Sequence, residues 1–309
     1  MRLGVLDVGS NTVHLLVVDA YHGAHPWPAY SEKSELRLAE KIGPDGRLTK
    51  AGGESLIEAV GRARDAAARH ETEDLLAFAT SAVRDATNSA AVLRRVREET
   101  GVDLQVLSGE AEAIMTFLAV RRWFGWSAGR ILVLDIGGGS LELATGIDEE
   151  PDAALSLPLG AGRLTREWLH GDPPSAHSVD KLQDYVESQV AKAATRLEQA
   201  GWDHPVATSK TFRTLARLAG AAPSSAGPRA TRMLTRQGLH QVLAFIRRIP
   251  SSALAEIDGV SAGRAHQILA GAVVAEATLR CLNLDEVEIC PWALREGVIL
   301  RRLDVLEST

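Results

Sequence analysis

The stretch LVLDIGGGSLELATG, from Leu132 to Gly146, has the pattern of a β-hairpin with an unusual tip. An apolar run ends at Asp135, three consecutive glycines follow, and a second apolar run starts after Ser140. Glycine has no Cβ, so several backbone N–H groups of such a turn can face one concavity and bind an anion, phosphate above all. We therefore expect a phosphate-binding loop formed by Gly137, Gly138, Gly139 and Ser140.

The same pattern occurs a second time, near the start of the chain. GVLDVGSNTVHLLVVD, from Gly4 to Asp19, also has an apolar run, Asp-x-Gly, small or polar residues, a hydroxyl and a second apolar run. Asp7 and Asp135 lie 135 − 7 = 128 positions apart, about the length of a domain. One glycine turn is weak evidence, because any tight hairpin favours glycine, but two in register predict two related halves. The loop of the first half consists of Gly9, Ser10, Asn11 and Thr12.

Together the two loops suggest a site for a phosphate and a hard cation. They would contact the phosphate from two sides, while Asp7 and Asp135, at the strand ends, would hold the cation through carboxylate and water. The alternative is a pair of ordinary turns whose acids face solvent.

The rest of the chain alternates between strand and helix patterns. Apolar runs predict strands at 2–7, 13–20, 74–80, 103–107, 153–160 and 286–290, in addition to the hairpin at 132–146. Helical spacing and end signals predict helices at 51–70, 88–101 (capped by Asn88 and stopped by Gly101), 108–124, 179–197 and 292–306. From residue 179 onward we expect mainly helix. Such alternation predicts a mostly parallel sheet covered by helices.

Composition and charge exclude two classes of partner. The 309 residues carry a formal net charge of −6, and every run of Lys and Arg has acidic residues nearby. Binding of long nucleic acid depends on neutralising many phosphates, so this charge pattern argues against it. No window approaches the ~18 apolar residues that a membrane span requires, and the first residues have the pattern of a strand rather than of a signal peptide. Cys281 and Cys290 match no metal-binding spacing. They predict free, buried thiols in a reducing compartment, so we expect a cytoplasmic protein.

Seven stretches, in this order, cover nearly the whole chain and carry a resemblance to a known family: DVGSNTVHLLV (Asp7–Val17), ATSAVRDATN (Ala79–Asn88), VLSGEAEA (Val106–Ala113), DIGGGSLEL (Asp135–Leu143), LPLGAGRLTREWL (Leu157–Leu169), GVSAGRAHQILAG (Gly259–Gly271) and CPWALREGVIL (Cys290–Leu300). The two loops are similar to the phosphate loops of the actin, Hsp70 and sugar-kinase superfold. Within that superfold the chain resembles the exopolyphosphatase/guanosine pentaphosphate phosphohydrolase (Ppx/GppA) family.

The resemblance implies an α/β fold of two actin-like (ribonuclease H-like) domains, each with a mixed central sheet flanked by helices, and an active cleft between them. We expect the first domain to span residues 1–125 and the second 126–309, because the chain resembles the short, two-domain form of the family. The resemblance also implies hydrolysis of a terminal phosphoanhydride with Mg²⁺, for which Mn²⁺ is the alternative metal. It is compatible with a homodimer, for which the sequence has no interface signature.

Two glutamates are the candidates for catalysis. Glu112 stands where the family's catalytic glutamate falls, in the first turn of the helix that Ser108 opens, and would be the base that orients the attacking water. Without the family resemblance, Glu112 would be interpreted as a carboxylate that interacts favourably with a helix N-terminus. Glu110, in the same turn, is the other candidate for the base. Glu142 lies two residues beyond Ser140, on the same side of its strand, and would orient water or bind the metal. The alternative for Glu142 is an outward polar residue.

Metal ligands and further phosphate contacts complete the expected site. Asp135 is the first candidate for binding Mg²⁺, together with Asp7. Guanidinium groups suit a bidentate grip on phosphate. The arginines that stand in family-like stretches are Arg84, Arg163 and Arg264.

Three features stay outside this set. Lys210, in ATSKTFRTLARL, stands where many relatives have a glycine-rich turn, and its role is open. His266 lies among apolar residues of a predicted helix and is expected to be structural. GVSAG, from Gly259 to Gly263, matches the nucleophile-elbow pattern but lacks the buried strand that this motif needs, so we expect a helix start there.

The leading hypothesis is an exopolyphosphatase that removes terminal phosphate from inorganic polyphosphate, with a preference for short chains. Hydrolysis of guanosine pentaphosphate (pppGpp) by the same residues is the alternative, and the sequence does not separate the two. An actin-like kinase is disfavoured, because CPWALREG stands where an adenosine-binding glycine turn would be expected. A P-loop ATPase is disfavoured, because no G-x-x-x-x-G-K-[ST] motif occurs. A non-catalytic sensor of polyphosphate or alarmone is disfavoured by the presence of Glu112, Glu142 and Asp135.

Overall fold

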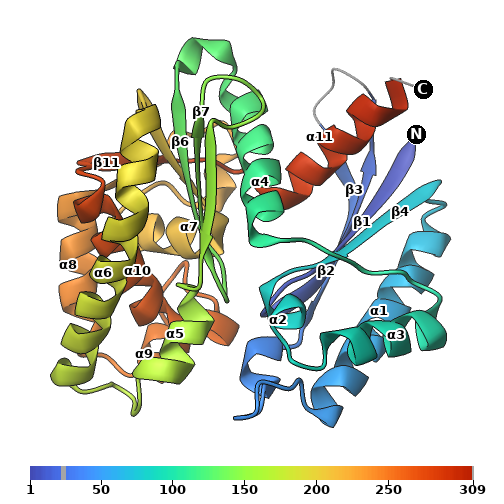
Figure 1. Cartoon of the computed structure of the whole chain (residues 1–309), viewed down its shortest axis with the longest axis horizontal. Helices are drawn as coiled ribbons and strands as arrows, with labels where there is room; N and C mark the ends of the chain where they lie inside the picture. The colour runs from blue at the N-terminus through green and yellow to red at the C-terminus, as the bar shows by residue number, and fades with distance from the viewer. Residues whose placement is uncertain (22–25, 308–309) are drawn as a thin grey trace. The chain divides into compact units, whose positions relative to one another are not determined.

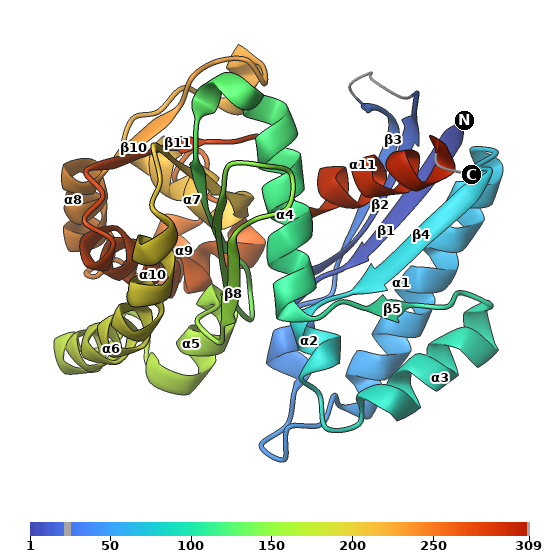
Figure 2. The same cartoon turned by 45° about the horizontal axis from the view of Figure 1, so that its top comes forward.

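The computed structural model describes residues 1–21 and 26–307 of the chain (Figures 1 and 2). The chain divides into two compact units, the first formed by Met1–Met115 together with Leu294–Thr309 and the second by Thr116–Ala293. Each unit contains one β-sheet with helices on its faces. No helix in the described part of the chain is both long and apolar enough to cross a bilayer.

The first unit is built on a five-stranded sheet with the order β3-β2-β1-β4-β5. Its strands are β1 (Arg2–Val8), β2 (Thr12–Asp19), β3 (Trp27–Glu35), β4 (Asp74–Ala79) and β5 (Gln105–Val106). Its helical segments are η1 (Leu38–Lys41), α1 (Lys50–Arg69), α2 (Ser81–Arg84), α3 (Ser89–Thr100), the first part of α4 (Gly109–Phe124) and α11 (Leu294–Glu307). Strands β1, β2 and β3 pair antiparallel, whereas β4 is parallel to both β1 and β5.

The second unit is built on a six-stranded sheet with the order β10-β11-β9-β6-β7-β8. Its strands are β6 (Ile131–Ile136), β7 (Leu141–Gly146), β8 (Ala153–Leu157), β9 (His204–Thr208), β10 (Met233–Thr235) and β11 (Glu286–Ile289). Its helical segments are η2 (Trp126–Ala128), α5 (Ala161–Trp168), α6 (Ala176–Ala200), α7 (Ser209–Leu218), η3 (Ser224–Ala226), α8 (Arg236–Ile246), α9 (Ser251–Leu254), η4 (Ala262–Gln267) and α10 (Ile268–Cys281). Strands β6, β7 and β8 pair antiparallel, and β9 is parallel to β6 and β11.

The two sheets repeat one topology. The order β3-β2-β1-β4-β5 in the first unit corresponds to β8-β7-β6-β9-β11 in the second, to which β10 adds an edge strand. Both sheets are mixed, which confirms the expected fold class, whereas a mostly parallel sheet, expected from the alternation of elements alone, is not found. In each sheet the first antiparallel hairpin, β1–β2 or β6–β7, carries the predicted loop.

Helix α11 packs on the first sheet, although the sequence-based limits assign it to the second domain. Its Ile299 and Leu303 belong to the same buried cluster as Leu3 and Val5 of β1. Figure 2 shows α11 on the face of the sheet opposite to α1. Burial of two such side chains stabilises this contact by roughly 1.5–3 kcal/mol each. The compact units therefore divide inside α4, at residues 115 and 116, and after residue 293.

Gly297 of α11 lies against the backbone of α4. A Cβ at this position would be 1.8 Å from the carbonyl oxygen of Met115, so no other residue fits without a shift of the backbone. This explains the glycine in the stretch CPWALREGVIL.

Three strands were not predicted, each for a physical reason. Strand β9 lies in the middle of its sheet but contains Pro205, a residue that argues against a central strand. Strand β3 is a polar edge strand with mostly exposed residues, which has no apolar run. Strand β10 is only three residues long.

Two local predictions are corrected by the side chains. Helix α3 starts after Asn88 and ends at Gly101, as expected, but the Asn88 side chain does not cap it. Instead the Asn88 amide bonds the backbone N–H and carbonyl of Leu48, at 2.8 and 3.0 Å. Both cysteines are free thiols, but only Cys290 is buried, and Cys281 is partly exposed.

Candidate functional site

The two predicted loops are the same turn. The Gly137 N–H donates to the Ser140 carbonyl at 2.9 Å, and the Gly9 N–H donates to the Thr12 carbonyl at 2.9 Å. The donors and acceptors are separated by the same 128 positions as the two aspartates, since 137 − 9 = 128 and 140 − 12 = 128. The internal repeat of the sequence is therefore also a repeat of backbone hydrogen bonding.

The loop of the second unit presents unpaired backbone donors. Within residues 1–21 and 26–307, no acceptor bonds the N–H groups of Gly138, Gly139 or Ser140. Gly139 and Ser140 are buried, and buried N–H groups are rarely left without a partner. Three adjacent donors of this kind are suited to the oxygens of a phosphate.

Close packing against this loop requires a glycine at position 160. Among the described residues, the glycines with positive φ do not include Gly137, Gly138 or Gly139. Gly160, at the start of α5, lies directly against the loop, and a Cβ there would be 2.2 Å from the Gly139 carbonyl carbon and 2.3 Å from its nitrogen. Gly160 was not among the predicted site residues. The feature that could have indicated it is its position between Leu159 and Ala161 in a family-like stretch.

Helix α5 fixes the carbonyl groups of the same loop. The Ala161 N–H donates to the Gly137 carbonyl at 3.0 Å, and the Arg163 N–H donates to the Gly138 carbonyl at 2.9 Å. The Arg163 Nε also donates to the Gly139 carbonyl at 3.0 Å. Arg163 therefore positions the loop, and its role as a direct phosphate contact stays a prediction.

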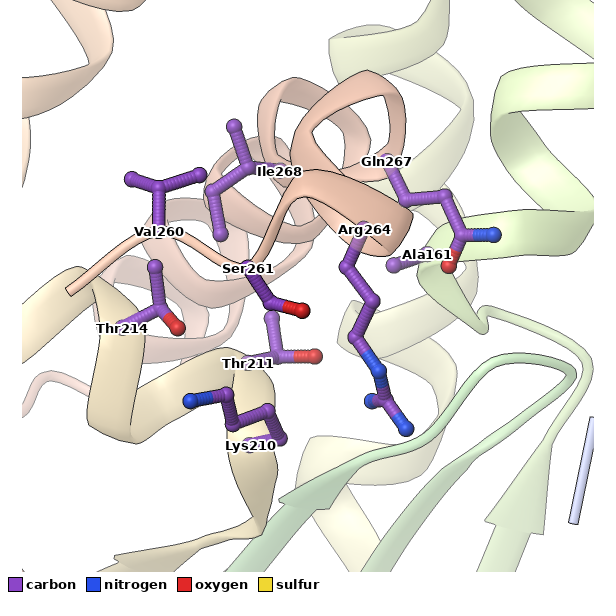
Figure 3. A pocket seen from close by; sticks show the side chains of 9 residues that line it. All are labelled: Ala161, Lys210, Thr211, Thr214, Val260, Ser261, Arg264, Gln267 and Ile268. Carbon is purple, nitrogen blue, oxygen red and sulfur yellow. The ribbon is translucent and has the colours of Figure 1, made fainter. Parts of the chain in front are cut away.

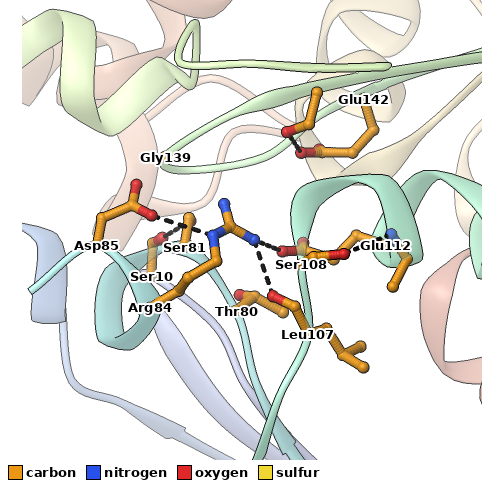
Figure 4. Close-up of polar contacts among 12 residues, drawn as sticks. Ser10, Thr80, Ser81, Arg84, Asp85, Leu107, Ser108, Glu112, Gly139 and Glu142 are labelled. Carbon is orange, nitrogen blue, oxygen red and sulfur yellow. Dashed lines mark hydrogen bonds and ion pairs between the residues drawn. The ribbon is translucent and has the colours of Figure 1, made fainter. Parts of the chain in front are cut away.

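The loop of the first unit is held by its own neighbours. The Ser10 and Ser81 hydroxyls are 2.9 Å apart and both are buried (Figure 4). The Ala39 N–H donates to the Ser10 carbonyl at 3.1 Å, and the N–H groups of Leu36 and Arg37 donate to the Asn11 carbonyl. The contact of Ala39 in this unit corresponds to that of Arg163 in the other.

A small cavity adjoins the glycine loop of the second unit (Figure 3). Its lining includes Ala161, Arg264, Lys210 and Ser261. Ser261 immediately precedes the 3-10 helix η4, and α9, not a strand, comes before it, so the nucleophile-elbow pattern is excluded as expected. His266 lies on η4, with its Nε2 3.1 Å from the Gln267 side-chain nitrogen.

A row of polar side chains crosses the second sheet at the end of β6. Asp135 of β6 is the register partner of Glu142 on β7, and Glu142 is the partner of Ser156 on β8. The Ser156 hydroxyl donates to Glu142 Oε1 at 2.9 Å, and Glu142 is 5% exposed (Figure 4). Glu142 is therefore not an outward polar residue, and it shares a face with Asp135.

This pair of carboxylates fits a hard cation. Like charges directly opposite each other on neighbouring strands are destabilising, and a bound cation would offset their repulsion. Mg²⁺ is commonly held by one or two carboxylates, with waters and substrate phosphates as its other ligands. The described residues contain no cluster of three or more His, Cys, Asp or Glu side chains suited to a metal, so two carboxylates are what the second unit offers.

Asp7 has different surroundings from Asp135. The Nε of Arg295, on α11, lies 4.0 Å from Asp7 Oδ2, and the Nη1 of the same residue lies 3.3 Å from His14 Nε2. His14, the register partner of Asp7, also lies 2.8 Å from the Ser31 hydroxyl. A neighbouring guanidinium weakens the case for Asp7 as a metal ligand.

Glu112 is held by Arg84 in the first unit. The Ser108 hydroxyl accepts the Ala111 N–H at 3.1 Å and so caps α4, as predicted. Glu112 is 7% exposed and accepts a hydrogen bond from Arg84, whereas Glu110 in the same turn is exposed (Figure 4). The structure thus gives Glu112, and not Glu110, a fixed position.

Arg84 is itself held from three sides. Besides Glu112, it donates to the Leu107 carbonyl at 3.1 Å and to Asp85 at 3.0 Å. Burial by itself lowers the pKa of Arg84, but the carboxylates of Glu112 and Asp85 outweigh it, so the pKa is raised. Arg84 positions Glu112, and its contact with phosphate stays a prediction.

Three residues of the two sites were missed by the sequence analysis besides Gly160. They are Ser81, Ser156 and Arg295, which contact Ser10, Glu142 and Asp7 respectively. Ser81 and Arg295 stand in family-like stretches, which was the available signal. Ser156 had none, because its role depends on strand register.

These features define a class of protein. Two mixed sheets of one topology, each with a phosphate-type loop between its first two strands, are two actin-like domains. The chain belongs to the Ppx/GppA phosphatase family, whose model matches residues 17–306.

Relatives support the same grouping. Exopolyphosphatase 1 of Mycobacterium tuberculosis is 62% identical over 305 residues, which are 98% of this chain and 89% of that protein. Guanosine-5'-triphosphate,3'-diphosphate pyrophosphatase of Vibrio vulnificus is 27% identical over 98% of this chain and 59% of its own length. The crystal structure of the Aquifex aeolicus member of the Ppx/GppA family has a TM-score of 0.81 and 26% identity, covering 100% of this chain and 99% of that one.

Proposed function

We propose that this protein is an exopolyphosphatase that hydrolyses the terminal phosphoanhydride of inorganic polyphosphate and releases orthophosphate. The observation that carries the proposal is the loop of Gly138, Gly139 and Ser140, with three unpaired N–H donors next to the carboxylates of Asp135 and Glu142. The similarity to Exopolyphosphatase 1 of Mycobacterium tuberculosis, over nearly the whole chain, supports polyphosphate as the substrate.

Phosphoanhydride hydrolysis requires a positioned phosphate, a positioned water and neutralised charge. In the proposed reaction, the backbone N–H groups of the two loops, with the hydroxyls of Ser10, Thr12 and Ser140, bind the terminal phosphate. Arg264 adds a cation to this contact.

Glu112 is the proposed base. Its carboxylate accepts a proton from the attacking water, and Arg84 and the first turn of α4 hold it in one orientation. The water oxygen forms a bond to the terminal phosphorus while the bridging P–O bond of the anhydride breaks. The terminal phosphate is released as orthophosphate, and the leaving group is the polyphosphate chain, one unit shorter.

Asp135 and Glu142 would hold Mg²⁺, with Mn²⁺ as the alternative. The metal would neutralise charge on the phosphate oxygens. Asp7, beside Arg295, would contribute to orientation of the loop and less to the metal. We further propose that the protein acts in the cytoplasm, where Cys281 and Cys290 stay reduced, and that it forms a homodimer.

Two other functions compete. Hydrolysis of pppGpp would use the same residues. The more distant relative from Vibrio vulnificus is named guanosine-5'-triphosphate,3'-diphosphate pyrophosphatase. A non-catalytic sensor would bind polyphosphate or the alarmone without turnover. The higher identity to the exopolyphosphatase favours polyphosphate over pppGpp, and the fixed position of Glu112 favours hydrolysis over binding alone. We further propose that short chains are preferred.

The test is phosphate release with Mg²⁺ from short and long polyphosphate, pppGpp and ATP, compared for the wild type, Glu112→Gln and the matched control Glu110→Gln. We expect release mainly from short polyphosphate, a loss of about 10²–10⁴-fold in Glu112→Gln, and little change in Glu110→Gln. Release of phosphate mainly from pppGpp would instead support hydrolysis of the alarmone as the function. Tight binding without release would support the sensor, and unchanged turnover in Glu112→Gln would remove this residue from catalysis.

A further inference from the structure

The cavity beside the glycine loop contains groups that suit an anion. Two cationic side chains, Lys210 and Arg264, line it together with the hydroxyl residues Thr211 and Ser261 (Figure 3). The hydroxyls of Thr211 and Ser261 point to the same side as the Arg264 guanidinium. Hydroxyl donors combined with cations form strong, charge-assisted hydrogen bonds with phosphate oxygens.

Thr211 is the most informative member of this set. It is 7% exposed, and its hydroxyl has no hydrogen-bond partner among the described residues. Thr211 is the third residue of α7, so the residue four positions before it, Ala207, belongs to strand β9 and not to the helix. The Thr211 methyl group packs against Gly271, where a Cβ would be 2.5 Å from it, and this contact leaves the hydroxyl facing the cavity.

The cavity is joined to the glycine loop by direct contacts within the same unit. Ala161 lines the cavity and donates its N–H to the Gly137 carbonyl. A Cβ on Gly162 would be 3.1 Å from both the Gly138 carbonyl oxygen and the side-chain nitrogen of Gln267, another lining residue. The cavity and the glycine loop are therefore neighbours in the second unit, joined by the first residues of α5.

The size of the cavity selects what can enter. Its volume is about 10 Å³, which is about the room of one water molecule. This space is about the size needed by one oxygen atom of a phosphate group.

We infer that Lys210, Thr211 and Ser261, together with Arg264, form a second phosphate subsite, which binds an oxygen of the phosphate adjoining the one in the glycine loop. This inference rests on the proposed function, since it takes inorganic polyphosphate as the ligand. It assigns Lys210 a role in affinity for the polyphosphate chain and none in the chemical step.

Two variants test the subsite. The side chain of Lys210 is exposed, and Lys210→Met replaces it with an uncharged side chain of similar length. Thr211→Val removes the hydroxyl but keeps the methyl group that packs against Gly271. Lys210→Arg restores the cation. Lys192→Met, on the exposed face of α6, is the matched control for loss of one positive charge from the same unit.

The measurements are the KM and kcat for inorganic tripolyphosphate and pppGpp, and the Kd of tripolyphosphate determined by calorimetry in EDTA. We expect Lys210→Met and Thr211→Val to raise the KM and Kd for tripolyphosphate about ten- to a hundredfold, with kcat little changed. Lys210→Arg should recover most of the affinity, and Lys192→Met should behave like the wild type. Thermal unfolding of Thr211→Val establishes that the variant is folded.

The outcomes separate this inference from the proposed function. Values of Kd for Lys210→Met and Thr211→Val equal to that of Lys192→Met would overturn the subsite, even if the wild type hydrolyses polyphosphate. A loss in kcat with unchanged KM would also overturn it, as would weaker binding of pppGpp alone. If the wild type releases no phosphate, the proposed function fails, and the Kd comparison still decides whether the cavity binds a phosphate chain.

Discussion

The hairpins of the two units share a backbone and differ in their charge. The turn hydrogen bonds are 2.9 Å in both, and Asp7 and Asp135 occupy equivalent places. The residue opposite the aspartate is His14 in the first hairpin and Glu142 in the second. In the first unit Arg295 approaches the aspartate, whereas the second unit places two carboxylates side by side. One backbone thus holds two electrostatic environments, and only the second suits a cation.

The segments that support the two loops also differ. In the first unit, the backbone N–H groups of Leu36, Arg37 and Ala39 bond the loop carbonyls. In the second unit, the backbone N–H groups of Ala161 and Arg163 do so, and the absence of a side chain on Gly160 lets α5 approach Gly139 closely. The second loop is therefore the more tightly packed of the two.

Glu142→Gln and His14→Gln should separate the two hairpins most clearly. The glutamine can keep the hydrogen bond to Ser156 but removes the second charge opposite Asp135, so cation binding weakens. We expect phosphate release to fall about 10²-fold or more in Glu142→Gln and the Mg²⁺ concentration for half-maximal rate to rise. His14→Gln removes only the ring contacts with Ser31 and Arg295, so it should lose less than about tenfold. Assays over a series of Mg²⁺ concentrations measure both effects, and equal losses would contradict the assignment of the cation to the second unit.

Gly160→Ala and Gly9→Ala compare the packing of the loops. A Cβ on Gly160 would lie 2.2 Å from Gly139, whereas one on Gly9 would lie 3.5 Å from the Thr12 carbonyl oxygen, an ordinary contact. We expect Gly160→Ala to cost about 1–3 kcal/mol, which lowers Tm by about 2–4 °C per kcal/mol, and to reduce activity as well. Gly9→Ala should leave Tm nearly unchanged. Thermal unfolding of both variants decides the matter, and a larger effect at Gly9 would refute the packing argument.

Glu276→Gln tests a smaller difference between the units. Helix α10, which precedes the fifth strand of its sheet, is almost wholly buried, whereas α3 in the first unit buries only Val92, Val96 and Thr100. Glu276 of α10 is 8% exposed, and within the described residues its Oε2 has no hydrogen-bond partner. Burial raises the pKa of Glu276, and His240 and Arg236 oppose this only in part.

The sign of the pH effect follows from that raised pKa. The folded state binds the proton more tightly than the unfolded state, so the contribution of Glu276 to stability is present below its unfolded pKa and is lost as pH rises through the folded pKa. At pH 7–8 we expect Glu276→Gln to be more stable than the wild type by about 1 kcal/mol, or about 2–4 °C in Tm. Near pH 4 the two should converge. Unfolding curves across this range, with exposed Glu198→Gln as control, check it, and a difference in Tm that is independent of pH would contradict the explanation.

Much of this protein could be predicted from the sequence, because the signals are local. The alternation around Asp7 and Asp135, with glycines and hydroxyls between two apolar runs, predicts both hairpins and their repeat. The periodicity of Val179, Leu182 and Val186 predicts the buried face of α6, and all three are buried. Ser108 caps α4 through a contact that spans three residues.

Only the tertiary structure decided how these local elements combine. The pairing of Asp135 with Glu142 and Ser156 depends on strand register, and the hold of Arg84 on Glu112 joins segments 28 residues apart. The place of β9 in the centre of its sheet, despite Pro205, and of α11 on the first sheet, depends on which apolar faces bury each other. Sequence periodicity specifies which face of an element is apolar, but which partner covers that face is set by contacts between distant parts of the chain.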